Sequence, residues 1–165
     1  MKRVMRMATK KFSSLFAYYD YVDKQLKFCM NEIGIQLKNE MKDYLFQNWY
    51  KKYTPTQYNR TFNLLDSITF KLEKQGNASY VVKVGYDTDL IHAEYDEYSF
   101  FNQHMSMGGE DVSDIVPYYI EKGNGKNPYF MYKGIGVLEY MREYMEERAT
   151  AKLAFLLHQK GITIK

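Results

Sequence analysis

The hydrophobic pattern of this chain changes its period at Pro55. Before Pro55, apolar residues recur at every third or fourth position, which is the spacing of one face of an α-helix. Between Ile68 and Val84, apolar residues instead alternate with polar ones, as they do in a strand with one buried face. Because proline lacks a backbone N–H and forces Thr54 out of the helical conformation, the preceding helix must end near Tyr53. The sequence therefore predicts an α+β fold.

The predicted N-terminal helix has a single apolar face. Its start is set by Ser13 or Ser14, because either hydroxyl can cap a helix. Charged and amide side chains fill the positions between the apolar ones, as expected for the solvated side. The apolar stripe comprises Leu15, Tyr18, Val22, Leu26, Cys29, Ile33, Leu37, Met41, Leu45 and Trp49.

The length of this helix raises a packing problem. A continuous helix over residues 14–53 is about 60 Å long, whereas a compact chain of this size is about 40 Å across. We therefore expect a kink or two segments, with Gly34 as the weak point and Asp20 as a second cap. The alternative is a helix that projects and needs a partner to cover its apolar stripe.

A β-hairpin is predicted at the centre of the chain. Residues 68–73 and 80–85 alternate as two antiparallel strands, and Gln75–Asn77 supplies the positive-φ residues of the turn. A shorter extended piece over residues 90–95 adds an edge strand. The sequence thus predicts an antiparallel sheet built on this hairpin.

Two further helices are predicted. Ser113 or Asp114 caps a short helix that ends at Lys122, and a C-terminal helix starts near Val137 and ends at Gly161. Early glutamates and late basic residues in the C-terminal helix match the helix dipole. We expect both helices to pack on one face of the sheet.

The chain is long enough for one domain with one core. We expect long loops within residues 96–112 and 123–134, which lie between the hairpin and the C-terminal helix. The predicted single domain, residues 1–165, comprises a flexible basic arm at 1–12, a helical region at 13–53, the hinge and hairpin at 54–95, loops with a short helix at 96–136, and the C-terminal helix and tail at 137–165.

Few residues have the spacing of a catalytic or metal site. The lone Cys29 excludes an internal disulfide and a multi-cysteine zinc site, and its place on the apolar face indicates a buried side chain. His92, His104 and Asp96 form a competent ligand set for a transition metal, but their spacing matches no helical ligand pair. His92 and Glu94 resemble the start of the zinc-deaminase signature, whose paired cysteines are missing. We therefore predict no enzyme activity, no catalytic or metal-binding residue and no cofactor.

Charge and aromatic content bear on partners. The net charge of +3 is too balanced to indicate nucleic-acid binding by itself, although the first eleven residues carry five bases and no acid. The 17 Tyr and 10 Phe suit surfaces that other protein chains cover, and core filling explains them nearly as well. No apolar run reaches the roughly 20 residues that a membrane span needs, so we expect a soluble protein made in the cytoplasm.

The order of elements resembles a known family. Residues 53–68 read Tyr-Thr-Pro-x-x-Tyr-x-Arg-Thr-x-x-Leu-Leu-x-Ser-Ile and are followed by the hairpin. The loop Phe101-Asn102-Gln103-His104 with Gly108-Gly109, the segment Ile115–Gly123 and the closing Leu156–Ile162 come next. This arrangement resembles the small head-tail joining, or neck, proteins of tailed bacteriophages, of the tail-completion type. The resemblance covers about residues 30 to 162, and Tyr58–Ile68 is its most specific part.

The resemblance implies a structural role without catalysis. Such proteins assemble as a ring of copies, with connector or adaptor proteins on the head side and a tail-tube or tail-terminator protein on the tail side. The implied location is the neck of the virion, after synthesis in the cytoplasm of a bacterial host. The resemblance implies no membrane contact and is compatible with transient contact with packaged DNA.

Two alternatives remain from the sequence. A tail terminator or tail-tube adaptor belongs to the same class, whereas a nucleic-acid-binding adaptor would use the basic arm and exposed tyrosines. In the structural role, the interfaces are expected in the N-terminal helix and the two long loops. The candidate interface residues are Trp49, Tyr53, Tyr58, Arg60, Phe100, Phe101, His104, Met105, Met107, Tyr129 and Phe130.

Overall fold

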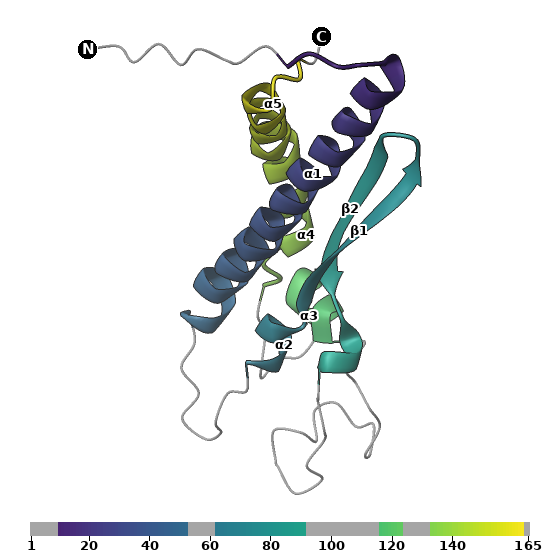
Figure 1. Cartoon of the computed structure of the whole chain (residues 1–165). Coiled ribbons are helices and arrows are strands. Elements are labelled where there is room, and N and C mark those ends of the chain that lie inside the picture. Colours follow the sequence, from purple (N-terminus) through teal and green to yellow (C-terminus); the bar gives the residue numbers. More distant parts are fainter. Residues whose placement is uncertain (1–9, 53–61, 92–115, 124–132, 164–165) are drawn as a thin grey trace, which may run out of the picture.

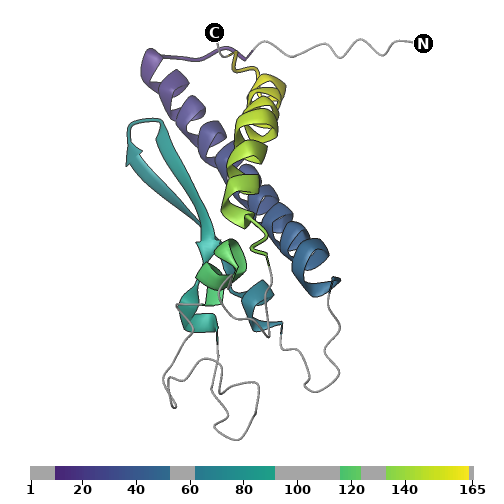
Figure 2. The same ribbon diagram turned by 180° about the vertical axis from the view of Figure 1, so that it is seen from behind.

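The longest element, α1 (Leu15–Leu45), forms the backbone of the molecule in a computed structural model (Figure 1). An antiparallel hairpin lies along one side of α1, and the C-terminal helices lie along another (Figure 2). The α+β fold predicted from the sequence is confirmed. The structure describes residues 10–52, 62–91, 116–123 and 133–163.

The helix α1 is continuous, so the predicted kink or division is wrong. Its cap is Ser14, whose hydroxyl accepts a hydrogen bond from the Ala17 N–H at 3.1 Å. Gly34 stays helical because the ring of Phe70 packs against the space that a side chain would fill. Asp20 caps no second helix, and its carboxylate instead accepts a bond from Lys24, one turn later, at 2.7 Å.

A π-helical turn, η1 (Phe46–Tyr50), extends α1 before the chain leaves the helix. The Lys51 N–H bonds to the Phe46 carbonyl at 2.9 Å and closes this turn. The helical region therefore ends close to the position predicted from Pro55, which itself lies outside the described residues.

The central hairpin is confirmed, with β1 (Ile68–Gly76) paired to β2 (Ser79–Tyr86). The positive-φ residue of the turn is Ala78, with φ of 49°, and not a residue of Gln75–Asn77 as predicted. The turn falls one residue later because the register shifts between Lys74 and Gly76.

Two short helical turns flank the hairpin where the sequence indicated none. The turn α2 (Asn63–Asp66) leads into β1, and its Leu64 is buried. The 3₁₀ turn η2 (Thr88–Leu90) follows β2. The predicted edge strand is therefore wrong at Leu90, whereas residues 92–95 lie outside the described part of the chain.

The predicted short helix is α3 (Val116–Lys122), with its end at Gly123. Gly123 has φ of 79°, the left-handed conformation expected at a helix end. The side chain of Glu121 accepts a bond from the Leu138 N–H at 3.0 Å and so caps the next helix from outside. The predicted caps Ser113 and Asp114 lie outside the described residues.

The C-terminal helix begins at Val137, as predicted, and has three parts. They are α4 (Val137–Tyr144), the π-helical turn η4 (Met145–Ala149) and α5 (Thr150–Gln159). Gly161 ends it in the left-handed conformation, with φ of 78°. The Ile162 N–H reaches back five positions to the Leu157 carbonyl at 2.9 Å, which completes a Schellman motif.

The core lies where α1, α4 and the base of the hairpin meet. Cys29 is fully buried, as its place on the apolar stripe predicted. The residues of the apolar stripe from Cys29 to Leu45 are buried. The residues of the main core cluster are Ile33, Leu37, Met41, Leu45, Leu64, Ile68, Ile91, Ile120, Val137, Met141, Tyr144 and Ala149.

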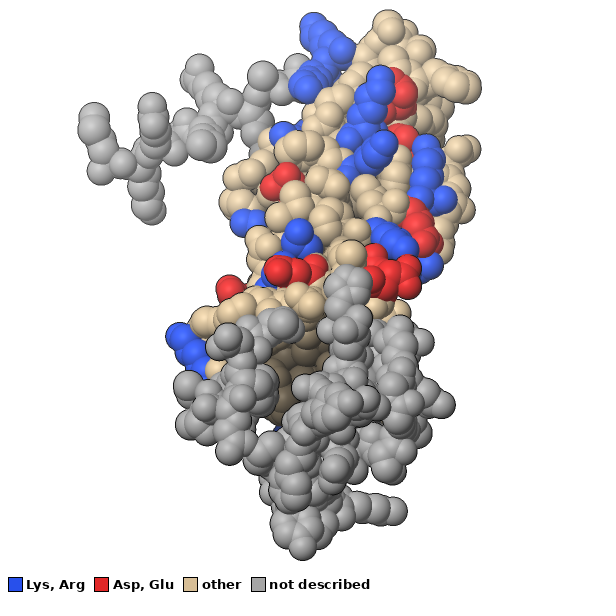
Figure 3. Space-filling view, turned by 90° about the horizontal axis from the view of Figure 1, so that it is seen from below, with Lys and Arg blue, Asp and Glu red and all other residues tan. Residues whose placement is uncertain are grey.

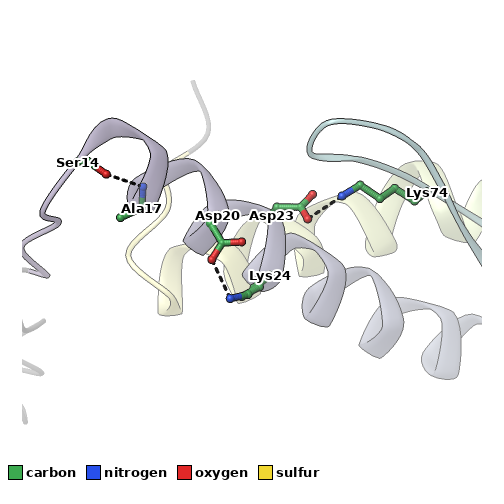
Figure 4. A network of polar contacts seen from close by, with 6 residues as sticks. All are labelled: Ser14, Ala17, Asp20, Asp23, Lys24 and Lys74. Carbon is green, nitrogen blue, oxygen red and sulfur yellow. Dashed lines mark hydrogen bonds and ion pairs between the residues drawn. The ribbon is translucent and has the colours of Figure 1, made fainter.

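The tip of the hairpin is tied to α1 by Asp23 (Figure 4). The carboxylate of Asp23 accepts bonds from the Lys74 ammonium at 2.9 Å and from the Ala78 N–H at 3.1 Å. The bond from Lys74 is the main reason why the pKa of Asp23 is lowered. The tip therefore stops at the level of Asp23, and the first turns of α1 extend beyond it (Figures 1 and 2).

We expect Asp23→Ala to release the hairpin tip from α1. The Ala78 amide loses its acceptor, so its hydrogen exchange, measured by mass spectrometry, speeds up several-fold. Because the folded pKa of Asp23 lies below its ordinary 3.8, the wild-type tie is fully present above pH 3.8 and is lost as pH falls through the lowered pKa. Asp20→Ala, which breaks an exposed pair on the same helix, is the control. Unchanged exchange at Ala78 in Asp23→Ala would contradict the tie.

Candidate protein-binding surfaces

Among the predicted interface residues, Trp49 lies within the described part of the chain. It sits in η1 and packs half-buried against the core, so its interface role stays a prediction. The other ten lie outside the described residues, namely Tyr53, Tyr58, Arg60, Phe100, Phe101, His104, Met105, Met107, Tyr129 and Phe130.

The start of α1 carries an exposed apolar surface. Leu15 is 67% exposed, Phe16 88% and Tyr19 58%, and Phe12 and Tyr18 beside them are also exposed. The apolar stripe thus continues past the hairpin tip without a cover in the described structure. We call these five residues the N-terminal apolar surface. Sequence reasoning found Leu15 and Tyr18 but missed the other three, which lie off the stripe.

This surface is held in place by local contacts. The Phe12 ring lies 5.3 Å from the rings of both Tyr18 and Tyr21. The Lys10 ammonium lies 4.1 Å from the centre of the Tyr21 ring. The Tyr21 hydroxyl donates to the Lys160 carbonyl at 2.8 Å, which fixes the start of α1 to the end of α5. The exposed aromatic residues are therefore displayed on an anchored element.

A second exposed surface lies on α4 and η4. Glu139, Glu143, Glu146 and Glu147 are all exposed, and we call them the acidic ridge. Spacings of three and four residues place them along adjoining faces of the helix. Leu138 and Met145, two exposed apolar residues, lie on the same helix, one residue before Glu139 and Glu146. From the sequence, these glutamates were interpreted only as charges that match the helix dipole. That all four are exposed is seen only in the fold.

A tyrosine cluster joins α1 to α4. The Tyr140 hydroxyl donates to the Glu40 carboxylate, and the Tyr140 ring stacks on Tyr44 with centres 3.9 Å apart. Gln36 donates to the Tyr144 hydroxyl at 2.7 Å. The bond to Glu40, followed by burial, raises the pKa of Tyr140 to about 12. These contacts tie α1 to α4.

This cluster makes stability sensitive to alkaline pH. The folded pKa of Tyr140 lies above the ordinary value of 10, so its contribution is complete below pH 10 and is lost as pH rises through about 12. We expect Tyr140→Phe to lower the free energy of unfolding by about 1 kcal/mol at neutral pH. The variant should also lose stability less steeply between pH 10 and 12 in urea titrations.

The matched control is Tyr19→Phe, because the Tyr19 hydroxyl makes no hydrogen bond within the described part of the chain. The control should have the neutral stability and alkaline slope of the wild type. Equal alkaline slopes for Tyr140→Phe and the wild type would show that the bond to Glu40 does not form in solution.

Cys29 and Tyr86 are two partly or fully buried groups whose pKa values are raised. Burial raises the pKa of the Cys29 thiol, which holds it in its unreactive form at neutral pH. Burial likewise raises the pKa of Tyr86, whose hydroxyl has no partner among the described residues. No group of three or more potential metal ligands occurs in residues 10–52, 62–91, 116–123 and 133–163. The candidate ligands His92, Asp96 and His104 lie outside these ranges.

Charges of both signs are interspersed on the face seen from the end opposite the start of α1 (Figure 3). Lys42 and Asp66 form an ion pair of 3.4 Å between α1 and α2. Phosphate binding favours a field of one sign, and the described residues on the face in Figure 3 do not form one.

The described residues define a small α+β protein with one exposed apolar surface and one exposed acidic surface. None of the helices in the described ranges has the length and apolar character needed to cross a membrane. The family model of YomN matches residues 14–151, and the chain belongs to the YomN family. This family derives from Bacillus phages, so the chain is a phage-associated protein. Searches of curated proteins and of solved structures each found no match.

Proposed function

We propose that this phage protein is a structural component of the virion, which assembles as a ring at the head-tail junction and joins the connector to the tail. The observation that carries the proposal is the uncovered N-terminal apolar surface. A stripe that is buried from Cys29 to Leu45 continues exposed at Leu15, where the helix has passed the hairpin tip. Exposed apolar surface of this kind marks a contact with another macromolecule.

The two ends of the molecule differ, which supports a place between two neighbours. One end carries the start of α1 and the end of α5, whereas α2, η2 and α3 lie at the other (Figure 1). A subunit in a ring with a layer above and a layer below needs a distinct surface toward each. The proposed partners are further copies, connector or adaptor proteins on the head side, and tail-tube or terminator proteins on the tail side.

The proposal assigns the protein no reaction and no cofactor. The polar groups that tie the described elements together, such as Tyr140 with Glu40 and Asp23 with Lys74, are engaged in fold-stabilising bonds. A joining role needs complementary surfaces and makes no demand on a nucleophile or a general base.

Cryo-electron microscopy of purified particles of the phage that encodes this chain tests the location. The expected result is a ring of copies between the connector and the first ring of the tail tube. Deletion of the gene should leave filled heads and separate tails. Copies at the tail end of the tube would instead identify a tail-tube adaptor or terminator, and a virion without any copies would contradict a structural role.

A second experiment separates this role from nucleic-acid binding. If the basic arm and exposed tyrosines hold DNA or RNA, binding is detectable at low salt and weakens steeply as salt rises. We expect no such binding by the purified chain, measured by fluorescence anisotropy with labelled single- and double-stranded DNA. Tight, salt-sensitive binding would favour the nucleic-acid adaptor.

A further inference from the structure

We propose that the N-terminal apolar surface of one copy docks on the acidic ridge of a second copy. This inference rests on the ring proposed above, and it specifies which two surfaces form the contact between neighbouring copies. The two surfaces belong to different elements, one at the end of the molecule and the other on the C-terminal helix further down (Figures 1 and 2).

Unpaired bases accompany the N-terminal apolar surface. Lys10 and Lys11 directly precede Phe12, and Lys27 lies eleven residues after Phe16, on the same face of α1. All three lysines are exposed, and none forms an ion pair within the described part of the chain. We call Lys10, Lys11 and Lys27 the basic flank. The surface therefore combines apolar area with free positive charge.

The acidic ridge offers the opposite pattern. Glu143, Glu146 and Glu147 form no ion pair with another described residue, and Glu139 meets Arg142 loosely at 3.8 Å. Leu138 and Met145 are exposed on the same helix, each one residue before a glutamate of the ridge and therefore about 100° from it around the helix axis. Three carboxylates without an ion pair in the described structure thus complement three ammonium groups that also lack one.

The complementarity points to a second copy as the occupant. Because each chain carries both surfaces at different places, a single contact between two copies leaves one surface of each copy available for a further contact. Repetition of such a contact gives a closed ring or an open chain. A nucleic acid would match the basic flank but leave the acidic ridge without a partner.

Charge reversal tests the contact. The basic-reversed variant carries Lys10→Glu, Lys11→Glu and Lys27→Glu, and the acid-reversed variant carries Glu143→Lys, Glu146→Lys and Glu147→Lys. We expect the wild-type chain to self-associate at low salt in native mass spectrometry and light scattering. Each variant alone should associate roughly ten- to hundredfold more weakly, because three attractions become repulsions.

Restoration provides the decisive measurement. A 1:1 mixture of the two variants should form alternating assemblies, and a chain with all six reversals should associate with itself again. A control with Lys71→Glu, Lys122→Glu and Lys133→Glu changes the net charge as much as the basic-reversed variant does, at exposed sites elsewhere, and should associate like the wild type. Circular dichroism of every variant establishes that it is folded.

Several results would overturn the inference. They are a wild-type chain that stays monomeric at high concentration and low salt, variants that assemble normally, and reversals that weaken assembly without restoration in the mixture or in the six-fold variant. The charge-swap series reports on the contact alone, whereas imaging of the particle reports on location. Failure of the contact is therefore distinguishable from failure of the proposed neck role.

Discussion

Gly34→Ala is expected to destabilise the fold by about 2 kcal/mol, although alanine is the better helix former by about 1 kcal/mol. A Cβ atom at Gly34 would overlap the ring of Phe70, which packs directly on the backbone of α1. Because the ring belongs to β1, relief of the overlap requires the hairpin to move away from the helix. Urea denaturation followed by circular dichroism measures the change.

A double-mutant cycle assigns the cause. In a Phe70→Ala background the overlap is gone, so Gly34→Ala should become neutral or stabilising. Gly85→Ala in β2 is the matched control, because a Cβ atom at Gly85 meets no atom within 4 Å. If Gly34→Ala costs the same with and without the Phe70 ring, the packing of the hairpin on α1 is not as described.

Leu45→Ala is expected to lower the free energy of unfolding by about 3 kcal/mol. Leu45 is 0% exposed and lies in the core cluster, so removal of its side chain leaves a cavity that the surrounding helices fill only in part. Thermal and urea unfolding of the variant at low protein concentration measure this loss.

Leu15→Ala provides the comparison within the same helix and the same stripe. Leu15 is 67% exposed, so its removal should change monomer stability by no more than about 0.5 kcal/mol. The same variant should weaken self-association, because Leu15 belongs to the N-terminal apolar surface. A large loss of monomer stability in Leu15→Ala would mean that the start of the stripe is covered within one chain.

Sequence patterns predicted the elements better than their exact limits. Ser14, the hairpin and Gly161 were identified from local rules, because a cap, an alternation and a left-handed end depend on neighbouring residues. The turn was misplaced because a register shift near Lys74 moved the positive φ to Ala78. Leu90, which was expected to begin a strand, lies in a 3₁₀ turn instead. The short apolar pattern at this position fits either structure.

The predicted kink failed for a tertiary reason. Glycine weakens an isolated helix, and Gly34 was therefore the natural place for a break. In the fold, the absent side chain admits Phe70, and the packing of the hairpin on that site holds the helix straight. The same residue that lowers helix propensity thus permits the Phe70 ring to pack against the helix backbone.

The candidate surfaces were only partly predictable. The aromatic content and the apolar stripe indicated that part of α1 needs a cover, but they did not show which part. The bonds from Lys74 and Ala78 to Asp23 fix where the hairpin ends along α1, and so fix which part of α1 the hairpin covers. The acidic ridge escaped notice because a charged helix face has the same pattern whether or not a partner uses it.

The sequence by itself determined the kinds and order of the longer helices and the hairpin, since helical spacing, strand alternation, Pro55 and the capping residues act over a few neighbouring positions. The tertiary structure decided that α1 stays unbroken and which side chains on it are buried, because burial depends on contacts between residues distant in the chain. For the same reason, only the fold revealed an apolar basic surface and an acidic surface at separate places on one molecule.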